Sequence, residues 1–357
     1  MPAEDPGLTP SRLVGDSTFG PITKSNDVSR VEENSVTFGE SKWVWMDGRV
    51  IPWQSATTHV SSHALHYGSG VFEGIRCYET SEGPAVFRLH AHLDRLYASA
   101  EIYGIKIPYS REELANGVEE IVRLNNFRSC YVRPICYLGS GSLGVHPGEN
   151  PVEVVILAWP WAPYLGADGL KNGVNVTISP WRKFDSRMLP TTAKACGQYL
   201  NSILAVRDAV SRGFAEALLL DAEGHLTEGS GENLFIVRDG RLLTNDERHS
   251  ILLGITREAV LTIAADLGYQ VEVRALDPED LLAADEAFLT GTAAEVTPIR
   301  EVDGTAIGEG APGVITEEIQ RAFFAATSGR DQRYREWLHL IDSKTGDVID
   351  WTLQTVS

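Results

Sequence analysis

The sequence has 357 residues, 43% hydrophobic and 22% charged, which is typical of a soluble globular protein with room for two domains. Its formal net charge of −18 disfavours binding to nucleic acid or to an anionic membrane surface, because phosphate groups carry the same sign. No apolar run is long enough for a transmembrane helix, and the N-terminus lacks the basic and apolar segments of a secretory signal. The four cysteines form no CxxC pair, and their scatter favours a reducing, cytoplasmic location.

The composition divides the chain into segments. Residues 1–40 are polar, rich in Pro, Gly, Ser, Asp and Glu, and without periodicity, which indicates an arm that is flexible or lies on a partner subunit. Folded structure is predicted to begin at residue 41, where Asp47 and Gly48 between apolar residues indicate a two-residue hairpin. The predicted organisation is a small α/β domain over 41–158, an interdomain connection over 159–170, a larger domain over 171–340 and a tail over 341–357.

A strand is predicted in the segment HYGSGVFEGIRCY. In an extended strand, Phe72, Gly74, Arg76 and Tyr78 share one face. The aromatic ring of Phe72, the missing side chain at Gly74 and the cation of Arg76 could form one wall of a pocket for a small amphipathic substrate. A half-exposed strand with Arg76 facing water is the alternative, and the spacing alone does not decide between them.

Two patterns in this half of the chain resemble sites without meeting their requirements. His63 and His66 lack a nearby carboxylate or cysteine set, so structural roles are favoured over metal binding. A GxGxxG pattern over 139–144 follows a predicted strand, but a dinucleotide site needs a helix immediately afterwards. Pro147 and Pro151 follow instead, so a Rossmann site is rejected.

Helical spacing of apolar residues predicts helices over 93–102 and 112–124, and a strand follows them. Within this strand Tyr131 and Arg133 share a face, and Pro134 predicts a position at a sheet edge or a bulge. A phenol beside a guanidinium suits carboxylate recognition, and a surface cation–π pair is the alternative.

Two aromatic residues, Trp161 and Tyr164, fall in the predicted connection between the domains. Aromatic side chains in such a connection either line the cleft between domains or pack against their neighbours, and both interpretations stay open.

Lys194 stands among small residues in the run PTTAKACGQYLNS. Apolar residues then recur at helical spacing over 200–210, so the lysine is predicted to lie just before an amphipathic helix. An amine in a small-residue pocket held by a packed helix can have a lowered pKa and act as a nucleophile or Schiff-base former. An ordinary exposed lysine is the alternative.

Beyond Lys194 the chain is predicted to form strands with tight turns, followed by helices. The segments ALLLD and HLTEGSGENLFIVRDGRLLT have the pattern of a meander, with a second hairpin turn at Asp239 and Gly240. Glu228 and Glu232 fall on a part of it that is predicted to be buried. A buried carboxylate needs a partner, either the backbone of a turn or a protonated nitrogen of a ligand.

Two glycine–threonine elements offer free backbone N–H groups. One is the start of a predicted helix at residues 254–256, and the other follows the strand EAFLT at residues 291–295. Two anion cradles, a buried carboxylate and a lone amine are the parts that a phosphorylated pyridine aldehyde requires. The lysine forms the imine, the carboxylate keeps the ring nitrogen protonated, and the N–H groups hold the phosphate.

The motifs together resemble those of class IV aminotransferases, in particular the bacterial branched-chain amino-acid aminotransferases, which are fold type IV pyridoxal 5'-phosphate enzymes. The similar motifs are HYGSGVFEGIRCY, YVRPICYLGSGSLGV, PTTAKACGQYLNS, TEGSGENLFIVRDG, LLGITREAV and FLTGTAAEVTPI, between about Lys42 and Leu338. The resemblance implies an α/β fold of the α+β type, like that of D-amino-acid aminotransferase, with two domains and the cofactor in the cleft between them. It also implies a homodimer or a higher homo-oligomer.

The resemblance implies roles for individual residues as well. Lys194 would form the Schiff base with the cofactor and then shuttle a proton, and Glu228 would hydrogen-bond the pyridine nitrogen. The other expected cofactor contacts are Arg95, Tyr199, Ile255, Thr256 and Thr292. The expected substrate contacts are Phe72, Gly74, Arg76, Tyr131, Arg133, Trp161, Tyr164, Ala293 and Ala294, with Tyr67 and Val145 from the other subunit. No metal ligand is expected.

The implied reaction is a ping-pong transamination of L-leucine, L-isoleucine or L-valine with 2-oxoglutarate. Tyr131, with the backbone at Ala293 and Ala294, would hold the α-carboxylate. Arg133 would bind the distal carboxylate of glutamate. A D-amino-acid or (R)-amine aminotransferase, an aminodeoxychorismate-type lyase, and a cofactor-binding protein without turnover are the alternatives. Cys196 and Gln198 stand where members of the family often have glycine and asparagine. The sequence does not indicate which of the three amino acids is the preferred donor.

Overall fold

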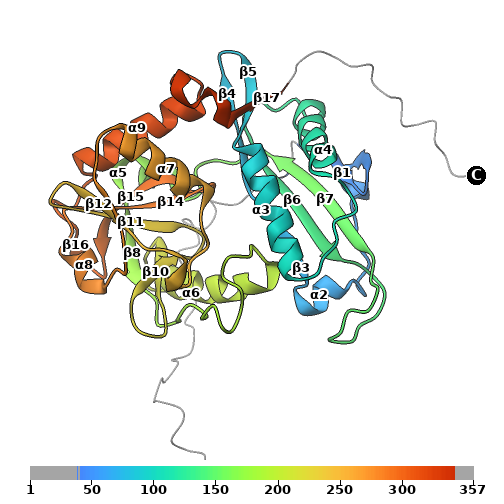
Figure 1. Ribbon diagram of the computed structural model, residues 1–357, viewed down its shortest axis with the longest axis horizontal. Coiled ribbons are helices and arrows are strands. Elements are labelled where there is room, and N and C mark those ends of the chain that lie inside the picture. Colours follow the sequence, from blue (N-terminus) through green and yellow to red (C-terminus); the bar gives the residue numbers. More distant parts are fainter. Residues whose placement is uncertain (1–37, 39–40, 342–357) are drawn as a thin grey trace, which may run out of the picture. The chain divides into compact units, whose positions relative to one another are not determined.

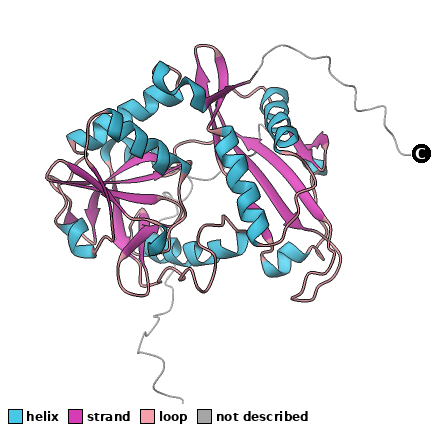
Figure 2. Cartoon of the chain, in the orientation of Figure 1, coloured by secondary structure: helices cyan, strands magenta, loops and turns pink. Residues whose placement is uncertain are grey.

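The computed structural model describes Phe38 and residues 41–341, so the predicted arm and tail fall almost wholly outside the described residues. Two sheets with flanking helices make up this part of the chain, as Figure 2 shows. None of the helices in the described part combines the length and apolar character that crossing a bilayer requires.

The first sheet comes mainly from the N-terminal half of the chain (Figure 1). Its strand order is β17-β5-β4-β6-β7-β1-β2, with β3 paired to β6. The predicted hairpin at Asp47 and Gly48 is confirmed, because it joins β1 to β2. The strands are β1 (Trp43–Met46), β2 (Arg49–Pro52), β3 (Gly70–Phe72), β4 (Ile75–Thr80), β5 (Gly83–Phe87), β6 (Cys130–Leu138), β7 (Val152–Trp159) and β17 (Leu338–Leu340).

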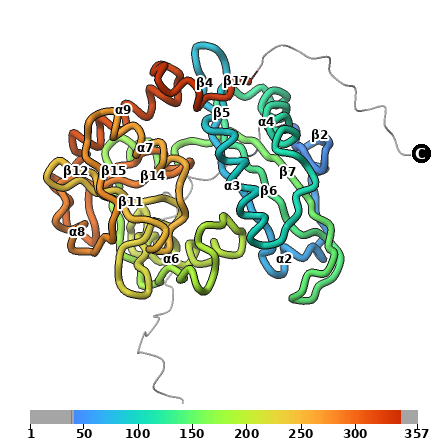
Figure 3. Tube along the Cα trace, viewed as in Figure 1, coloured from blue at the N-terminus to red at the C-terminus, as the bar shows by residue number. Residues whose placement is uncertain are grey.

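The chain returns to this sheet at its end. Strand β17 pairs antiparallel with β5, and Figure 3 shows the red C-terminal segment beside the blue β5. Three helices belong to the same part: α2 (His63–Tyr67), α3 (Leu89–Ile102) and α4 (Arg111–Leu124). The two longer ones confirm the predicted helices, and α4 begins with a capping box between Ser110 and Glu113.

The prediction that Pro134 marks an edge or a bulge was wrong, because β6 lies inside the sheet. On one side β6 pairs with β7, and on the other it pairs first with β4 and then with β3. Pro134 faces the break between those two strands, where its carbonyl accepts the N–H of Glu73 at 2.8 Å. Because no strand residue needs a donor there, the missing N–H of proline removes no ladder bond.

The second sheet has the order β10-β9-β8-β15-β14-β11-β12-β13. The predicted meander is confirmed over β9 to β12, with the hairpin turn at Asp239 and Gly240. The strands are β8 (Val174–Ile178), β9 (Glu216–Leu220), β10 (Leu226–Gly229), β11 (Asn233–Arg238), β12 (Arg241–Thr244), β13 (Val271–Val273), β14 (Glu286–Gly291), β15 (Glu295–Val302) and β16 (Thr305–Ala306), the last paired to β15.

Both faces of the second sheet are covered. Along β11, Phe235 and Val237 belong to the core under α7 and α9, whereas Leu234 and Ile236 belong to a core that includes Leu281 of α8. This alternation is the period of two expected of a strand buried on both faces. The helices are α5 (Gly166–Asn172), α6 (Tyr199–Ser211), α7 (Ile255–Asp266), α8 (Pro278–Leu282) and α9 (Val314–Thr327).

Helix α6 forms where the sequence predicts it, but a different face of the helix is buried. Ser202, Ala205 and Ala209 are buried, and the two alanines pack with Ala217 and Leu219 of β9. The larger apolar residues, such as Leu200 and Leu204, are exposed. Small side chains allow the helix to approach the strand closely. The periodicity of the large apolar residues therefore predicted the helix correctly but not the face that packs on β9.

Candidate active site

A cavity of about 460 Å³ is lined by residues from both sheets and from helices α3, α6 and α7, a size typical of small-molecule sites. It collects most of the residues that the sequence singled out. Those that line it are Phe72, Gly74, Arg95, Tyr131, Arg133, Trp161, Tyr164, Lys194, Tyr199, Glu228, Ile255, Thr256, Thr292 and Ala293.

Lys194 is held in the cavity wall through its backbone and its amine. Its N–H donates to Ser99 Oγ at 3.0 Å, and its carbonyl accepts the N–H of Phe72 at 3.1 Å. The amine donates to the Tyr199 hydroxyl at 2.7 Å. Burial lowers the pKa of the Lys194 amine, and the positive charge of Arg95 lowers it further. The amine is therefore suited to act as a nucleophile and proton carrier, unlike an ordinary solvated lysine.

Glu228 lies on β10 with a different partner at each carboxylate oxygen. Its Oε1 is 2.6 Å from Lys183 Nζ, and both side chains are less than a tenth exposed. Its Oε2 accepts the N–H of Leu252 at 3.0 Å and Asn233 Nδ2 at 3.4 Å. These contacts hold the carboxylate in the wall of the cavity, where it can pair with a protonated nitrogen of a ligand.

Arg95 is oriented by a carboxylate that the sequence analysis missed. Its Nε and Nη2 donate to the two oxygens of Glu73 at 2.6 and 2.9 Å, and its Nη1 donates to the carbonyl of Leu253. Glu73 is fully buried and also contacts His92 Nδ1 at 2.8 Å. Burial alone would raise the pKa of Glu73, but the charges and hydrogen bonds of Arg95 and His92 lower it overall. The arginine therefore has a fixed position at the cavity.

Both glycine–threonine elements predicted from the sequence lie at the cavity, whose lining includes Gly254, Thr256, Gly291 and Thr292. Helix α7 starts at Ile255 after Gly254, which provides no side-chain cap, so the N–H groups of its first turn remain free for an anion. A Cβ on Gly254 would lie 2.1 Å from Asn233 Oδ1, so this position must be glycine. At the second element, Arg76 donates to the carbonyls of Thr292 and Ala293 at 2.8 and 3.0 Å and fixes the turn.

Aromatic rings surround Arg133. Its guanidinium lies 4.6 Å from the centre of the Phe72 ring and 5.3 Å from that of Tyr131, whose hydroxyl accepts from Nη2 at 3.3 Å. Among the described residues, the buried Nε of Arg133 has no hydrogen-bond partner. A buried unpaired donor on a cation is costly, so the arrangement suits an anionic group of a bound ligand.

Tyr131 and Trp161 form the wall beside this arginine. Their ring centres are 4.5 Å apart in an edge-to-face arrangement, and Tyr164 contacts Trp161 at 6.0 Å. A Cβ on Gly74 would lie 1.8 Å from the Tyr131 hydroxyl, so the absence of a side chain at Gly74 makes room for that hydroxyl. Both residues of the predicted connection therefore line the cavity.

Two buried carboxyl groups lie next to the site. Burial raises the pKa of Glu216 to about 7, and it raises the pKa of Glu232 well above the ordinary range, with a further contribution from the negative charge of Glu216. Glu232 lines the cavity, and its Oε2 accepts the N–H of Gly231 at 3.0 Å. Glu232 therefore holds its proton more tightly than an exposed carboxyl group does.

Four predicted site residues do not line the cavity. Arg76 and Ala294 lie behind the turn at Thr292, where Arg76 positions the backbone. Tyr67 and Val145 are exposed, away from the cavity, and the Tyr67 hydroxyl donates to the carbonyl of Leu143 at 2.7 Å. The rejection of a Rossmann site agrees with the structure, because residues 139–150 contain no helix and lead to β7.

Lys183, Glu73 and Asn233 are site residues that sequence reasoning missed. Lys183 lies in an irregular segment between β8 and α6, where no periodicity marks it. In the strand pattern, Glu73 lies on the face opposite Phe72, so the sequence analysis did not select it. The contact between Glu73 and Arg95 is visible only in the structure. Asn233 was visible in the motif TEGSGEN, but its role depends on its cross-strand pairing with Glu228.

The chain is similar in sequence and in structure to known proteins. The model of the family described as amino-transferase class IV matches residues 70–302. The branched-chain-amino-acid aminotransferase of Pseudomonas aeruginosa is 46% identical over 298 residues, which are 84% of this chain and 97% of that protein. The crystal structure of the Escherichia coli branched-chain amino acid aminotransferase is similar with a TM-score of 0.83 and 43% identity, over 85% of this chain and 100% of that one.

A further similar structure bears on the cofactor. The branched-chain amino acid aminotransferase from T.th., complexed with N-(5'-phosphopyridoxyl)-L-glutamate, has a TM-score of 0.81 and 46% identity, and the match covers 85% of this chain and 99% of that one. The family resemblance and the fold type IV architecture expected from the sequence are thereby confirmed. The chain belongs to the class IV aminotransferase family.

Proposed function

We propose that the protein transfers the amino group of L-leucine, L-isoleucine or L-valine to 2-oxoglutarate, which yields the branched 2-oxo acid and L-glutamate. The proposal is supported by relatives of that activity, 46% identical in one case, that match over nearly their whole length. The observation that carries it is the unpartnered Arg133 Nε within an aromatic pocket. The pocket thus offers apolar surface to a branched side chain and a cation to the distal carboxylate of the second substrate.

The residues of the cavity fit pyridoxal 5'-phosphate. Lys194 offers an amine of lowered pKa, Glu228 a carboxylate for the ring nitrogen, and Tyr199 a hydroxyl beside the amine. Arg95 and the free N–H groups at the start of α7 suit the phosphate. When bound, the cofactor withdraws electrons from the substrate Cα and carries the amino group between the two substrates.

The residues of the chain perform the remaining tasks. Lys194 would hold the cofactor through its amine, and the lowered pKa of that amine would favour its taking the proton from the substrate Cα. Tyr199 orients the lysine through the 2.7 Å hydrogen bond. Tyr131 and the backbone at Ala293, which both line the cavity, hold the α-carboxylate, so each substrate is bound by the same groups at its reacting end.

A homodimer is part of the proposal. Apolar residues are exposed on several segments, including Leu65 and Tyr67 on α2, Val145 in the loop between β6 and β7, and Leu200 and Leu204 on α6. Clusters of exposed apolar side chains mark interaction surfaces. Tyr67 and Val145 would then reach the active site of the partner subunit, and a larger assembly remains compatible with the same surfaces.

The domain limits and the location remain proposals as well. We infer a small domain over 41–158 and a large one over 171–340, because each sheet draws nearly all its strands from one of these ranges. Strand β17 is the exception, since it returns to the first sheet. The free thiols of all four cysteines support a cytoplasmic location.

Initial rates with a panel of amino donors and 2-oxoglutarate test the proposed function. We expect L-glutamate to form with L-leucine, L-isoleucine and L-valine, and not with their D-enantiomers or with (R)-amines. Turnover only with D-amino acids or (R)-amines, or formation of a cleavage product without L-glutamate, would overturn the proposal. Cofactor binding without any turnover would indicate a binding protein instead.

A further inference from the structure

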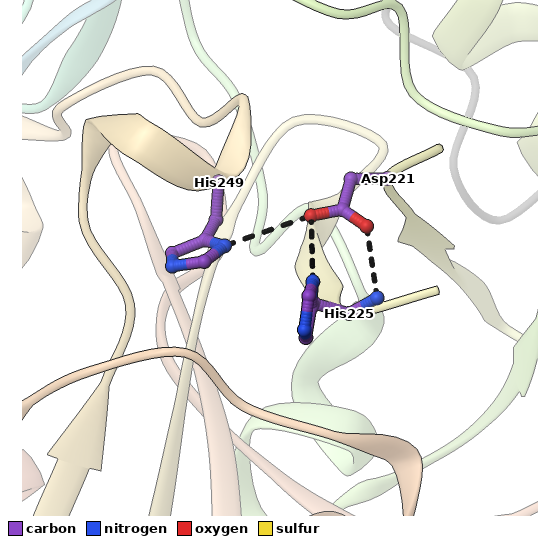
Figure 4. A group of neighbouring side chains, drawn as sticks. All are labelled: Asp221, His225 and His249. Atoms are coloured by element: carbon purple, nitrogen blue, oxygen red, sulfur yellow. Dashed lines mark hydrogen bonds and ion pairs between the residues drawn. The ribbon is translucent and has the colours of Figure 1, made fainter. Parts of the chain in front are cut away.

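We propose that Asp221, His225 and His249 form a binding site for a divalent transition-metal ion, outside the active-site cavity. Figure 4 shows the three side chains converging from two segments of the chain. Asp221 follows β9 and His225 precedes β10, whereas His249 ends the short 3-10 helix η4 (Glu247–His249). Their potential ligand atoms all lie within 4.8 Å of one another.

The aspartate is oriented before any ion binds. Its Oδ1 accepts three backbone N–H groups of the turn, from Glu223, Gly224 and His225, at 3.0, 2.8 and 2.8 Å. The turn therefore fixes the carboxylate, and Oδ2 points to the two imidazole rings (Figure 4). With a side chain only 8% exposed, Asp221 is a buried carboxylate whose only ionisable partners among the described residues are the two histidines.

The spacing matches metal coordination. Asp221 Oδ2 lies 3.3 Å from His225 Nδ1 and 3.6 Å from His249 Nδ1. In a tetrahedral zinc site with ligand bonds of about 2.1 Å, neighbouring ligand atoms are about 3.4 Å apart. Both measured separations are close to that edge length, so small rotations of the half-buried rings bring all three atoms to one ion. Two imidazoles and a carboxylate favour Zn²⁺ and its neighbours Co²⁺ and Ni²⁺ over Ca²⁺ or Mg²⁺.

A second carboxylate completes the arrangement behind one ring. Asp277 Oδ1 lies 3.8 Å from His225 Nε2, on the side of the imidazole away from Asp221. A histidine that ligates a metal usually directs its other N–H to a carboxylate, which fixes the ring and strengthens the ligand. With neutral imidazoles, the two carboxylates give the cluster a charge that a divalent cation balances.

The ion would join the turn at residues 221–225 to the segment that carries His249, which already contact each other through the Asp221 and His249 side chains. His249 lies three residues before Leu252, and the N–H of Leu252 donates to Glu228. The same segment leads into α7. A metal ion that binds only the folded chain raises the free energy of unfolding, and the increase grows with the ratio of the metal concentration to its Kd. We expect Zn²⁺ to raise the unfolding temperature, whether or not the active site is loaded.

Calorimetric titration of the full-length, cofactor-loaded protein with Zn²⁺, and absorbance titration with Co²⁺, test the site. We expect one ion per chain, a visible Co²⁺ spectrum that indicates nitrogen ligation, and a higher unfolding temperature with Zn²⁺. The H225Q/H249Q variant is expected to lose the binding, and Asp277→Asn to weaken it by about 10–100-fold. His146→Gln, which changes an exposed histidine on another loop, serves as the matched control.

Absence of Zn²⁺ binding by the wild-type protein in the micromolar range would overturn the proposal. Unchanged stoichiometry in the H225Q/H249Q variant would overturn it too, because the ion would then be bound elsewhere. Both substituted rings are partly exposed, so the variant is expected to fold, and its circular dichroism checks this directly. Metal binding is read without catalysis, so its failure is distinguishable from a failure of the proposed transamination.

Discussion

Lys183 Nζ and Glu228 Oε1 lie 2.6 Å apart, and their side chains are only 9% and 8% exposed. Both residues of this buried ion pair line the active-site cavity. When one partner of such a pair is lost, the remaining charge is left uncompensated, at a cost of about 3–5 kcal/mol. The protonated ring nitrogen of a bound cofactor would supply a replacement cation.

The variant Lys183→Met is therefore expected to destabilise the cofactor-free protein by about 3–5 kcal/mol and the loaded protein by less. Denaturant unfolding of both forms, with and without pyridoxal 5'-phosphate, measures the difference. Lys171→Met, at an exposed lysine, is the control and should leave both forms unchanged. An equal loss in the two forms would show that the cofactor ring does not approach Glu228.

Gly74→Ala tests how Tyr131 is placed. The new Cβ would lie 1.8 Å from the tyrosine hydroxyl, so the ring must move away from the α-carboxylate site. Overpacking of this kind costs about 1–3 kcal/mol, so we expect kcat/KM for L-leucine to fall roughly 10- to 100-fold. Tyr131→Phe, which removes only the hydroxyl, should lower the same parameter. Unchanged kinetics in Gly74→Ala would mean that Tyr131 does not hold the substrate.

Arg133→Leu tests the recognition of the second substrate. Loss of a buried charged partner costs about 2–5 kcal/mol, so kcat/KM for 2-oxoglutarate should fall by about 30-fold or more. The reaction with L-leucine, measured alone as a half-reaction, should change much less, because its side chain contacts the aromatic wall. Arg133→Lys keeps the positive charge, so its kcat/KM for 2-oxoglutarate is expected to lie between those of the wild-type protein and Arg133→Leu. Equal losses for both substrates would contradict a role in distal carboxylate binding.

Glu216 predicts a pH dependence of stability. Its native pKa of about 7 lies above its ordinary value of 4.5, so the folded protein binds this proton more tightly than the unfolded chain does. The resulting stabilisation is complete below pH 4.5 and is lost as the pH rises to about 7. The glutamine side chain of the Glu216→Gln variant is neutral at every pH, so the contribution of this residue to the pH dependence of the unfolding free energy should disappear.

Relative to wild type, the Glu216→Gln variant should therefore gain on the order of 2–3 kcal/mol in unfolding free energy between pH 5 and pH 8. The hydrogen bonds to Ala217 N–H and Ser230 Oγ remain possible for the amide. Denaturant unfolding at the two pH values gives the result, with Glu112→Gln at an exposed position as the control. A constant difference between wild type and Glu216→Gln would contradict the raised pKa.

Much of the architecture was predictable because local patterns determine it. The hairpins at Asp47–Gly48 and Asp239–Gly240, the helix carrying Arg95 and the helix starting at Ile255 form where turn residues and periodicity predict them. The face of α6 was not predictable, because packing on β9 depends on Ser202, Ala205 and Ala209 rather than on the large apolar residues.

The site was predictable where one residue carries a distinctive chemistry, and not where function depends on a long-range pair. Lys194 and Glu228 stand in motifs with a chemical rationale. The partner of Arg95 is Glu73, 22 positions away, and the partner of Glu228 is Lys183, in a segment without regular structure. Such pairs arise only when the sheets and loops assemble, so one sequence alone does not indicate them.

The absorbance spectrum of the cofactor-loaded protein during a single half-reaction tests the proposed transamination. We expect a visible band that L-leucine converts to a near-ultraviolet band, that D-leucine leaves unchanged, and that 2-oxoglutarate then restores. In Lys194→Ala the band should differ at the outset, and turnover should fall by at least about 10³-fold. A band that responds to D-leucine but not to L-leucine, or full turnover without Lys194, would contradict the account.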